Sequence, residues 1–178
     1  NETSTHNDFN AVDIDATGDV RLARNRINLS TKGYCTAIYV RNMSGLPTAQ
    51  AQIVNNVVMV GHGTTPPRRN ASKALTLKGD LANLLVAHNS LCVAGNEKDI
   101  TVSILGKMAD NVRLVNNLFA NTGKGVVYQC TRKENLASLR LEHNNLYTNG
   151  TSLADVGAPV ATLSAWMALS GERYAYNN

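Results

Sequence analysis

The sequence predicts a parallel β-solenoid, in which the chain winds through stacked coils of three short strands around one continuous core. Two observations predict this fold: a six-residue pattern recurs five times, and a strand-like segment precedes each copy. The pattern is an aliphatic residue, two variable residues, an asparagine, one variable residue and an apolar residue. Its copies are Leu22 to Ile27, Ile53 to Val58, Val86 to Leu91, Leu114 to Phe119 and Leu141 to Leu146.

The asparagines of this pattern give the repeat its period. They are Asn25, Asn56, Asn89, Asn117 and Asn144, and the spacings between them are 31, 33, 28 and 27 residues. A period in this range that persists through insertions is typical of stacked repeats. Each copy predicts a strand, a tight turn with the asparagine in a left-handed conformation, and a second strand. Stacked coils would bring the asparagines together as a hydrogen-bonded ladder.

A third strand in each coil is predicted before the asparagine pattern. These segments alternate with period two and are rich in aliphatic and β-branched residues; they are Ala11 to Asp15, Ala37 to Arg41, Ala74 to Lys78, Ile100 to Ile104 and Val126 to Gln129. Five to six coils about 4.8 Å apart would result. The predicted inward residues are Leu22, Ile27, Ile38, Val40, Ile53, Val58, Leu75, Leu77, Val86, Leu91, Val102, Ile104, Leu114, Phe119, Leu141 and Leu146. A β-sandwich is the alternative, but it needs hairpin turns that are largely missing.

The last part of the chain departs from the repeat. Residues 1–150 are expected to form the coils, and residues 151–178 a cap segment of the same domain. A short helix is predicted over Ala161 to Leu169, with Thr162 as N-cap and Gly171 just past its end. Its apolar face would cover the end of the stack. The alternative is that Trp166 serves as a platform for a sugar ring.

Composition permits an acidic partner but does not demand one. The formal charge is +4 and the pI is about 9.1, and no run of five or more like charges is present. Aromatic residues are few and are not interleaved with basic ones, so no nucleic-acid groove is expected. No apolar run reaches the length of a membrane span. Cys35, Cys92 and Cys130 are expected to be part-buried thiols, the alternative being one disulfide and a spare thiol.

The asparagine pattern, as in Leu114-Val115-Asn116-Asn117-Leu118-Phe119, resembles the right-handed parallel β-helix family typified by pectate lyases and polygalacturonases. The resemblance covers about residues 11 to 150. It implies that the asparagine turn joins the second and third strands of each coil. The ending, with Asn144-Asn145-Leu146-Tyr147 and Ala161 to Trp166, resembles secreted bacterial β-helix proteins of the Bacteroidetes type. The resemblance is specific for the fold and not for one activity.

The resemblance further implies that a polysaccharide would lie across the outer face of the first strand of each coil and the loop before it. On that face the sequence predicts Tyr39, Arg41, Thr76, Lys78 and Tyr128. The loop 61–73 would add three basic side chains, His62, Arg68 and Arg69. Arginine can bind a uronate carboxylate with two hydrogen bonds, so the strip suits an acidic glycan. The alternative is that these are ordinary solvated charges.

Asp13 and Asp15 are the candidate metal ligands, because an Asp-x-Asp on one strand places both carboxylates on the same side. They could bind Ca²⁺, the candidate cofactor, or act as an acid and base pair. A solvated strand face is the alternative. Gly61-His62-Gly63 resembles a Gly-His-Gly of polygalacturonases, but the clustered aspartates of those enzymes do not occur in this sequence. His88 and His143 are expected to be surface turn residues.

Two functions are therefore expected from the sequence. One is a secreted or cell-surface module that binds or processes a polysaccharide, as a lyase or glycoside hydrolase if it is an enzyme. The other is a non-catalytic spacer or adhesin-like module of a larger secreted or surface protein. Its partners would then be other domains of the same, longer chain. The basic strip favours the first function, and the absence of a complete catalytic set favours the second.

Overall fold

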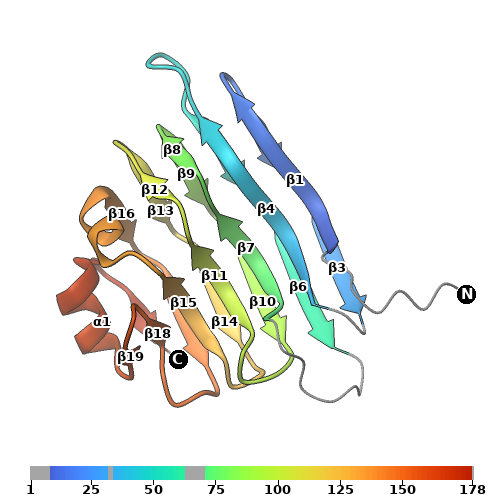
Figure 1. The fold of residues 1–178 in the computed structure, drawn as a ribbon, viewed down its shortest axis with the longest axis vertical. Helices are drawn as coiled ribbons and strands as arrows, with labels where there is room; N and C mark the ends of the chain where they lie inside the picture. Colours follow the sequence, from blue (N-terminus) through green and yellow to red (C-terminus); the bar gives the residue numbers. More distant parts are fainter. Residues whose placement is uncertain (1–8, 32–33, 63–70, 178) are drawn as a thin grey trace, which may run out of the picture.

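The computed structural model describes residues 9–31, 34–62 and 71–177, which form a parallel β-solenoid of about six turns. Figure 1 shows the strands of successive coils lying side by side, with the helix α1 (Leu163–Ser170) at the opposite end of the stack from β1. The predicted fold, three short strands in each coil and a short C-terminal helix, is confirmed.

The described strands form three sheets of nine, five and six strands. The first sheet holds β1 (Phe9–Thr17), β4 (Cys35–Ser44), β7 (Lys73–Leu77), β8 (Asp80–Ala82), β11 (Ile100–Ile104), β12 (Lys107–Met108), β15 (Val126–Cys130), β18 (Ala154–Asp155) and β19 (Pro159–Val160). The second sheet holds β2 (Arg21–Ala23), β5 (Ala51–Val54), β9 (Leu84–Ala87), β13 (Val112–Val115) and β16 (Leu139–Glu142). The third sheet holds β3 (Arg26–Thr31), β6 (Val57–His62), β10 (Ser90–Ala94), β14 (Leu118–Asn121), β17 (Asn145–Thr148) and β20 (Tyr176–Asn177).

The core lies between the three sheets, where the predicted inward residues meet. From the second coil onward these side chains are buried, and Leu75, Val102 and Leu114 are fully so. In the first coil Leu22 and Ile27 are only half-buried, although they pack against the same core. Alternating residues thus fill one continuous interior, as expected for strands of period two.

The asparagine ladder is confirmed in full. The side-chain Nδ2 of Asn56 donates to Oδ1 of Asn89 at 3.0 Å, and the backbone N–H of Asn56 donates to the same oxygen at 3.0 Å. The second proton of the Asn56 amide goes to the carbonyl of Leu22 in the preceding coil, at 3.0 Å. Equivalent bonds join Asn25 to Asn56, Asn89 to Asn117 and Asn117 to Asn144. The ladder therefore satisfies buried backbone groups at each turn.

The left-handed position of the turn was predicted at the wrong residue. The residue with positive φ is the one before each ladder asparagine, with φ between 54° and 60°; these residues are Arg24, Asn55, His88, Asn116 and His143. The physical reason is that the ladder asparagine must direct its side chain along the stack. The chain is therefore reversed one residue earlier, at an exposed position of variable sequence. His88 and His143 are surface turn residues, as predicted.

The C-terminal end is closed as predicted. Thr162 caps α1 by accepting from the backbone N–H of Ala165, and Gly171 follows the helix with φ 69°. Trp166 is fully buried and stacks on Tyr128, with ring centroids 4.7 Å apart. The alternative role of Trp166 as a sugar platform is therefore wrong, because no face of its ring reaches the surface.

Candidate functional site

The candidate site is the outer face of the first sheet, where strand register sets the order of the side chains. One column runs through Asp13, Tyr39, Thr76, Ser103, Gln129 and Asp155, each aligned with the next. Thr76 and Ser103, in the middle of this column, are fully buried, whereas Tyr39 and Gln129 are half-buried. A ligand on this face would therefore meet the ends of the column rather than its middle.

Tyr128 was predicted on this outer face, and the structure places it inside the solenoid. It is aligned with Val102 of the preceding coil, fully buried, and packs edge-on to Phe119 with ring centroids 5.6 Å apart. Burial raises the pKa of its hydroxyl well above the usual value. The sequence alone could not predict this placement. Val126 and Val127 are both apolar, so the pattern does not show which of them points toward the core.

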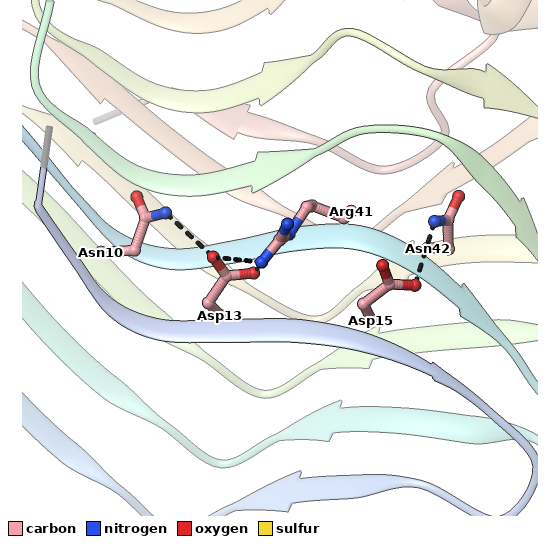
Figure 2. A network of polar contacts seen from close by, with 5 residues as sticks. All are labelled: Asn10, Asp13, Asp15, Arg41 and Asn42. Atoms are coloured by element: carbon pink, nitrogen blue, oxygen red, sulfur yellow. Dashed lines mark hydrogen bonds and ion pairs between the residues drawn. The ribbon is translucent and has the colours of Figure 1, made fainter.

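A polar network lies between β1 and β4 at the Asp13 end of this column. It consists of Asn10, Asp13, Asp15, Arg41 and Asn42, and we call it the β1–β4 network. Figure 2 shows Asp13 facing Arg41, and Asp15 facing Asn42, across the two strands. Arg41 donates to both oxygens of Asp13, from Nε at 2.9 Å and from Nη2 at 3.0 Å. Asn10 donates to Asp13 at 3.2 Å, and Asn42 donates to Asp15 at 3.0 Å.

A register shift creates this pairing. The alignment of β1 with β4 shifts between Ile14 and Asp15, so that Asp15 is aligned with Asn42 and Arg41 is the additional residue. Gly79, with φ 84°, lies against this bulge, and a Cβ there would collide with the carbonyl oxygen of Arg41. The glycine is thus required for the next coil to pack beneath Arg41.

The electrostatics of the network follow from the Asp13–Arg41 pair. The hydrogen bonds from Arg41 hold the pKa of Asp13 below its usual value, so this carboxylate is ionised and its charge is balanced. The side chain of Arg41 is 54% exposed and that of Asp13 is 32% exposed. The pair therefore presents a guanidinium and a carboxylate to solvent, with no excess of positive charge.

Of the other predicted site residues, Lys78 is exposed, whereas Thr76 is buried and its hydroxyl has no hydrogen-bond partner in the described part of the chain. Arg68 and Arg69 lie outside the described residues, as does the side chain of His62. Within residues 9–31, 34–62 and 71–177, no three His, Cys, Asp or Glu side chains are grouped so as to hold a metal ion. The sequence predicted only two metal ligands, Asp13 and Asp15, which are fewer than such a group needs.

The three cysteines are not joined by disulfides, and Cys35 and Cys130 are buried. Burial raises the pKa of the Cys92 thiol, which lies half-buried in the third sheet. The thiol interpretation of the cysteines is confirmed.

Among the described helices, none combines the length and the apolar character that crossing a membrane would require.

One segment of the stack was not predicted. Residues 171–177 follow α1 and form part of a sixth turn, in which Arg173 forms a backbone β-bridge with Glu142 and β20 pairs with β17. The segment keeps the frame of the repeat, and Ala175 stands 31 residues after Asn144, in the position of a ladder asparagine. The spacing alone could have revealed this turn.

Comparison with known proteins finds no matching family model, no matching curated protein and no matching solved structure.

Proposed function

We propose that this chain is a polysaccharide-binding module of a secreted or cell-surface protein, and that the β1–β4 network is its binding surface. The observation that carries the proposal is the exposed cluster of carboxylates, guanidinium and amide groups on two adjacent strands, beside the half-buried ring of Tyr39. The resemblance of the repeat to the pectate-lyase-like β-helix family supports the same ligand class.

The chemistry of these groups suits sugar hydroxyls. A hydroxyl both donates and accepts, so neighbouring hydroxyls of one sugar can donate to Asp13 or Asp15 and accept from Arg41 or Asn42. The tyrosine ring offers an apolar surface for a sugar face. Because the network holds two carboxylates against Arg41 and the nearby Lys78, it does not by itself select an acidic sugar.

Binding without catalysis is favoured over lyase or hydrolase chemistry. A general acid must hold a proton near neutral pH, and Asp13 is held ionised by Arg41. The same hydrogen bonds weaken Asp13 as a base. Processing of a polysaccharide would require a base and an electrophile from other residues, and an assay for unsaturated products tests this directly.

The proposal is tested with an array of oligosaccharides and polysaccharides, followed by an ultraviolet assay for unsaturated products on every ligand that binds. The double variant Arg41→Ala with Lys78→Ala should abolish binding and leave the melting temperature nearly unchanged, because exposed charges contribute little to stability. Arg21→Ala with Arg26→Ala, which removes two exposed positive charges outside the network, is the matched control and should bind as the wild type. Retention of binding by the double variant would contradict the assignment of the site.

A spacer or adhesin-like module is the second candidate. It is favoured by one observation: Asp13 already accepts three hydrogen bonds within the protein, so the network also joins β1 to β4. If this is its whole role, Asp13→Asn should lower the melting temperature, and no glycan on the array should bind the wild type.

A further inference from the structure

A second charged surface lies at the C-terminal end of the solenoid, on the second sheet. Arg113 and Arg140 are neighbours in register on β13 and β16, and Arg173 of the sixth turn is aligned with Glu142. The Nε of Arg140 contacts the carboxylate of Glu142 at 3.0 Å. We call these four residues the arginine corner. It brings three guanidinium groups to one carboxylate, so two positive charges are left without a partner within the group.

The arginines retain unused hydrogen-bonding capacity. The side chain of Arg140 is 59% exposed, although one edge of it contacts Glu142. The Nε of Arg113 is buried and has no hydrogen-bond partner among the residues that the structure describes. Glu142 is held ionised, since the hydrogen bond from Arg140, followed by the charges of Arg173 and Arg113, lowers its pKa. Arg140 therefore keeps donors directed to solvent for an anionic acceptor, whereas the buried Nε of Arg113 adds only its positive charge to the corner.

The same corner is hollowed and borders exposed aromatic rings. A shallow cavity of about 320 Å³ is lined by Leu139, Arg140, Leu141, Glu142, Gly171 and Arg173. Tyr174, the next residue, is 61% exposed and stacks on His143 with ring centroids 4.7 Å apart. Because His143 supports one face of this ring, the tyrosine is held in place one residue after Arg173, which lines the cavity. Tyr176, on β20, is 60% exposed as well.

We propose that the arginine corner binds an anionic sugar unit, with its carboxylate or sulfate group against Arg140 and Arg173, near the charge of Arg113, and with its ring against Tyr174. Guanidinium groups bind planar or tetrahedral oxyanions with paired hydrogen bonds, and an aromatic ring packs on the apolar face of a sugar. This inference rests on the proposed polysaccharide ligand and adds a second site with its own selectivity.

The pattern of charge favours an acidic polysaccharide over a nucleic acid. Nucleic acids bind through many phosphates, and proteins that recognise them carry extended basic surfaces. In this chain the formal charge is +4, and on the second sheet Leu85 and Gln52 separate the arginine corner from Arg21. A compact group of three arginines matches one or two anionic groups.

The inference is tested by affinity electrophoresis through gels containing polygalacturonate, dextran sulfate or neutral dextran. The variant Arg140→Gln with Arg173→Gln is compared with Arg21→Gln and Arg26→Gln, which removes the same charge from exposed residues at the other end of the solenoid. The corner variant should bind an acidic polysaccharide roughly 100-fold more weakly, if each lost charge-assisted contact contributes about tenfold. The control pair should bind as the wild type. An equal loss in both pairs would show a dependence on net charge alone and overturn the inference.

Two further variants sharpen the result. Glu142→Gln removes the competing carboxylate and should strengthen binding of the acidic polysaccharide severalfold. Tyr174→Asn keeps a residue that tolerates the left-handed backbone but removes the ring, and it should weaken the acidic polysaccharide without changing the affinity for inorganic sulfate. An unchanged affinity in both variants would contradict the geometry proposed for the sugar unit.

The same gels separate this inference from the proposed function. Loss of retention in Arg41→Ala with Lys78→Ala, but not in the corner variant, would overturn the arginine corner and leave the β1–β4 network. Arginine-dependent binding of inorganic sulfate without retention by any polysaccharide would overturn the proposed function and the sugar ligand together. Equal arginine-dependent binding of duplex DNA would show that the corner recognises phosphate groups and would overturn its assignment to a saccharide.

Discussion

The two ends of the described solenoid carry related residues but bury them to different extents. In the first coil, Leu22 and Ile27 point toward the core and remain half-buried. Their neighbours in register, Ile53 and Val58 of the second coil, are each 1% exposed. The side chains are similar, so the difference comes from the neighbouring coils: the second coil lies between two described coils, whereas the first has only one described coil beside it.

At the C-terminal end, the last coil is covered. Trp166 of α1 lies against Tyr128, and its indole nitrogen donates to the carboxylate of Glu172. Glu172 also accepts from the amide of Asn144 at 2.7 Å, so it provides the acceptor that a further asparagine would have offered. The ladder is thus terminated by a buried acid, and the core by an indole ring.

The comparison shows that burial in a stack depends on neighbours at both sides rather than on residue type. It follows that equivalent substitutions should differ in cost along the axis, and that the chemistry of the end groups should determine how stability responds to pH.

The largest effect is expected for Trp166→Ala, which removes the side chain that closes the core. The loss of packing should reduce the free energy of unfolding by about 3–5 kcal/mol. Urea unfolding measures this, with Tyr176→Ala as the control for an exposed aromatic residue in the same end of the chain. Equal midpoints for both variants would show that α1 does not stabilise the coils.

The next effect compares two leucines of one inward column. Leu114→Ala, at a fully buried position, should cost about 2–5 kcal/mol, because little of the cavity can collapse. Leu22→Ala should cost clearly less, since Leu22 is half-buried in the first coil. Chemical unfolding of the two variants side by side tests the comparison, and a larger loss for Leu22→Ala would contradict it.

A smaller effect is expected within the ladder. Asn89→Ala removes the acceptor of two N–H groups of Asn56 and the donor to the carbonyl of Ile53, each of them buried. Leaving buried polar groups unpaired should cost about 1–3 kcal/mol. Asn25→Ala, at the half-buried end, should cost less. Thermal unfolding monitored by circular dichroism measures both variants. Equal losses of stability would contradict the prediction, because they would mean that the ladder stabilises every turn alike.

The smallest effect is a dependence on pH that has opposite signs at the two ends. Burial raises the pKa of Glu172 above its ordinary value of 4.5, so the folded protein binds this proton more tightly than the unfolded chain. Its contribution is complete below pH 4.5 and is lost as pH rises through the raised pKa. Glu172→Gln should remove this slope from a series of unfolding curves.

Asp13 provides the opposite case for the same experiment. Its pKa is lowered from 3.8 by Arg41, so its contribution is present above that value and is lost as pH falls. Asp13→Asn should therefore flatten the acidic part of the curve and leave the slope near neutral pH unchanged. A slope that persisted in both variants would have to come from other groups.

Much of the fold can be predicted from the sequence because the repeat is local. The spacing of Asn25, Asn56 and their equivalents predicts the coils, and period-two alternation predicts the strands. Thr162 and Gly171 predict the ends of α1 from the chemistry of helix termini alone. Each of these signals lies within a few residues or in one fixed period.

The tertiary structure alone decided which side chains meet, because contacts between coils join residues about thirty positions apart through turns and loops of variable length. The register between β11 and β15 placed Tyr128 inside. The shift between β1 and β4 paired Arg41 with Asp13, which balanced the charge of a residue predicted to bind carboxylates. The return of the chain after α1 brought Arg173 into register with Glu142, two residues after Arg140, since a parallel stack aligns distant segments that no local pattern connects.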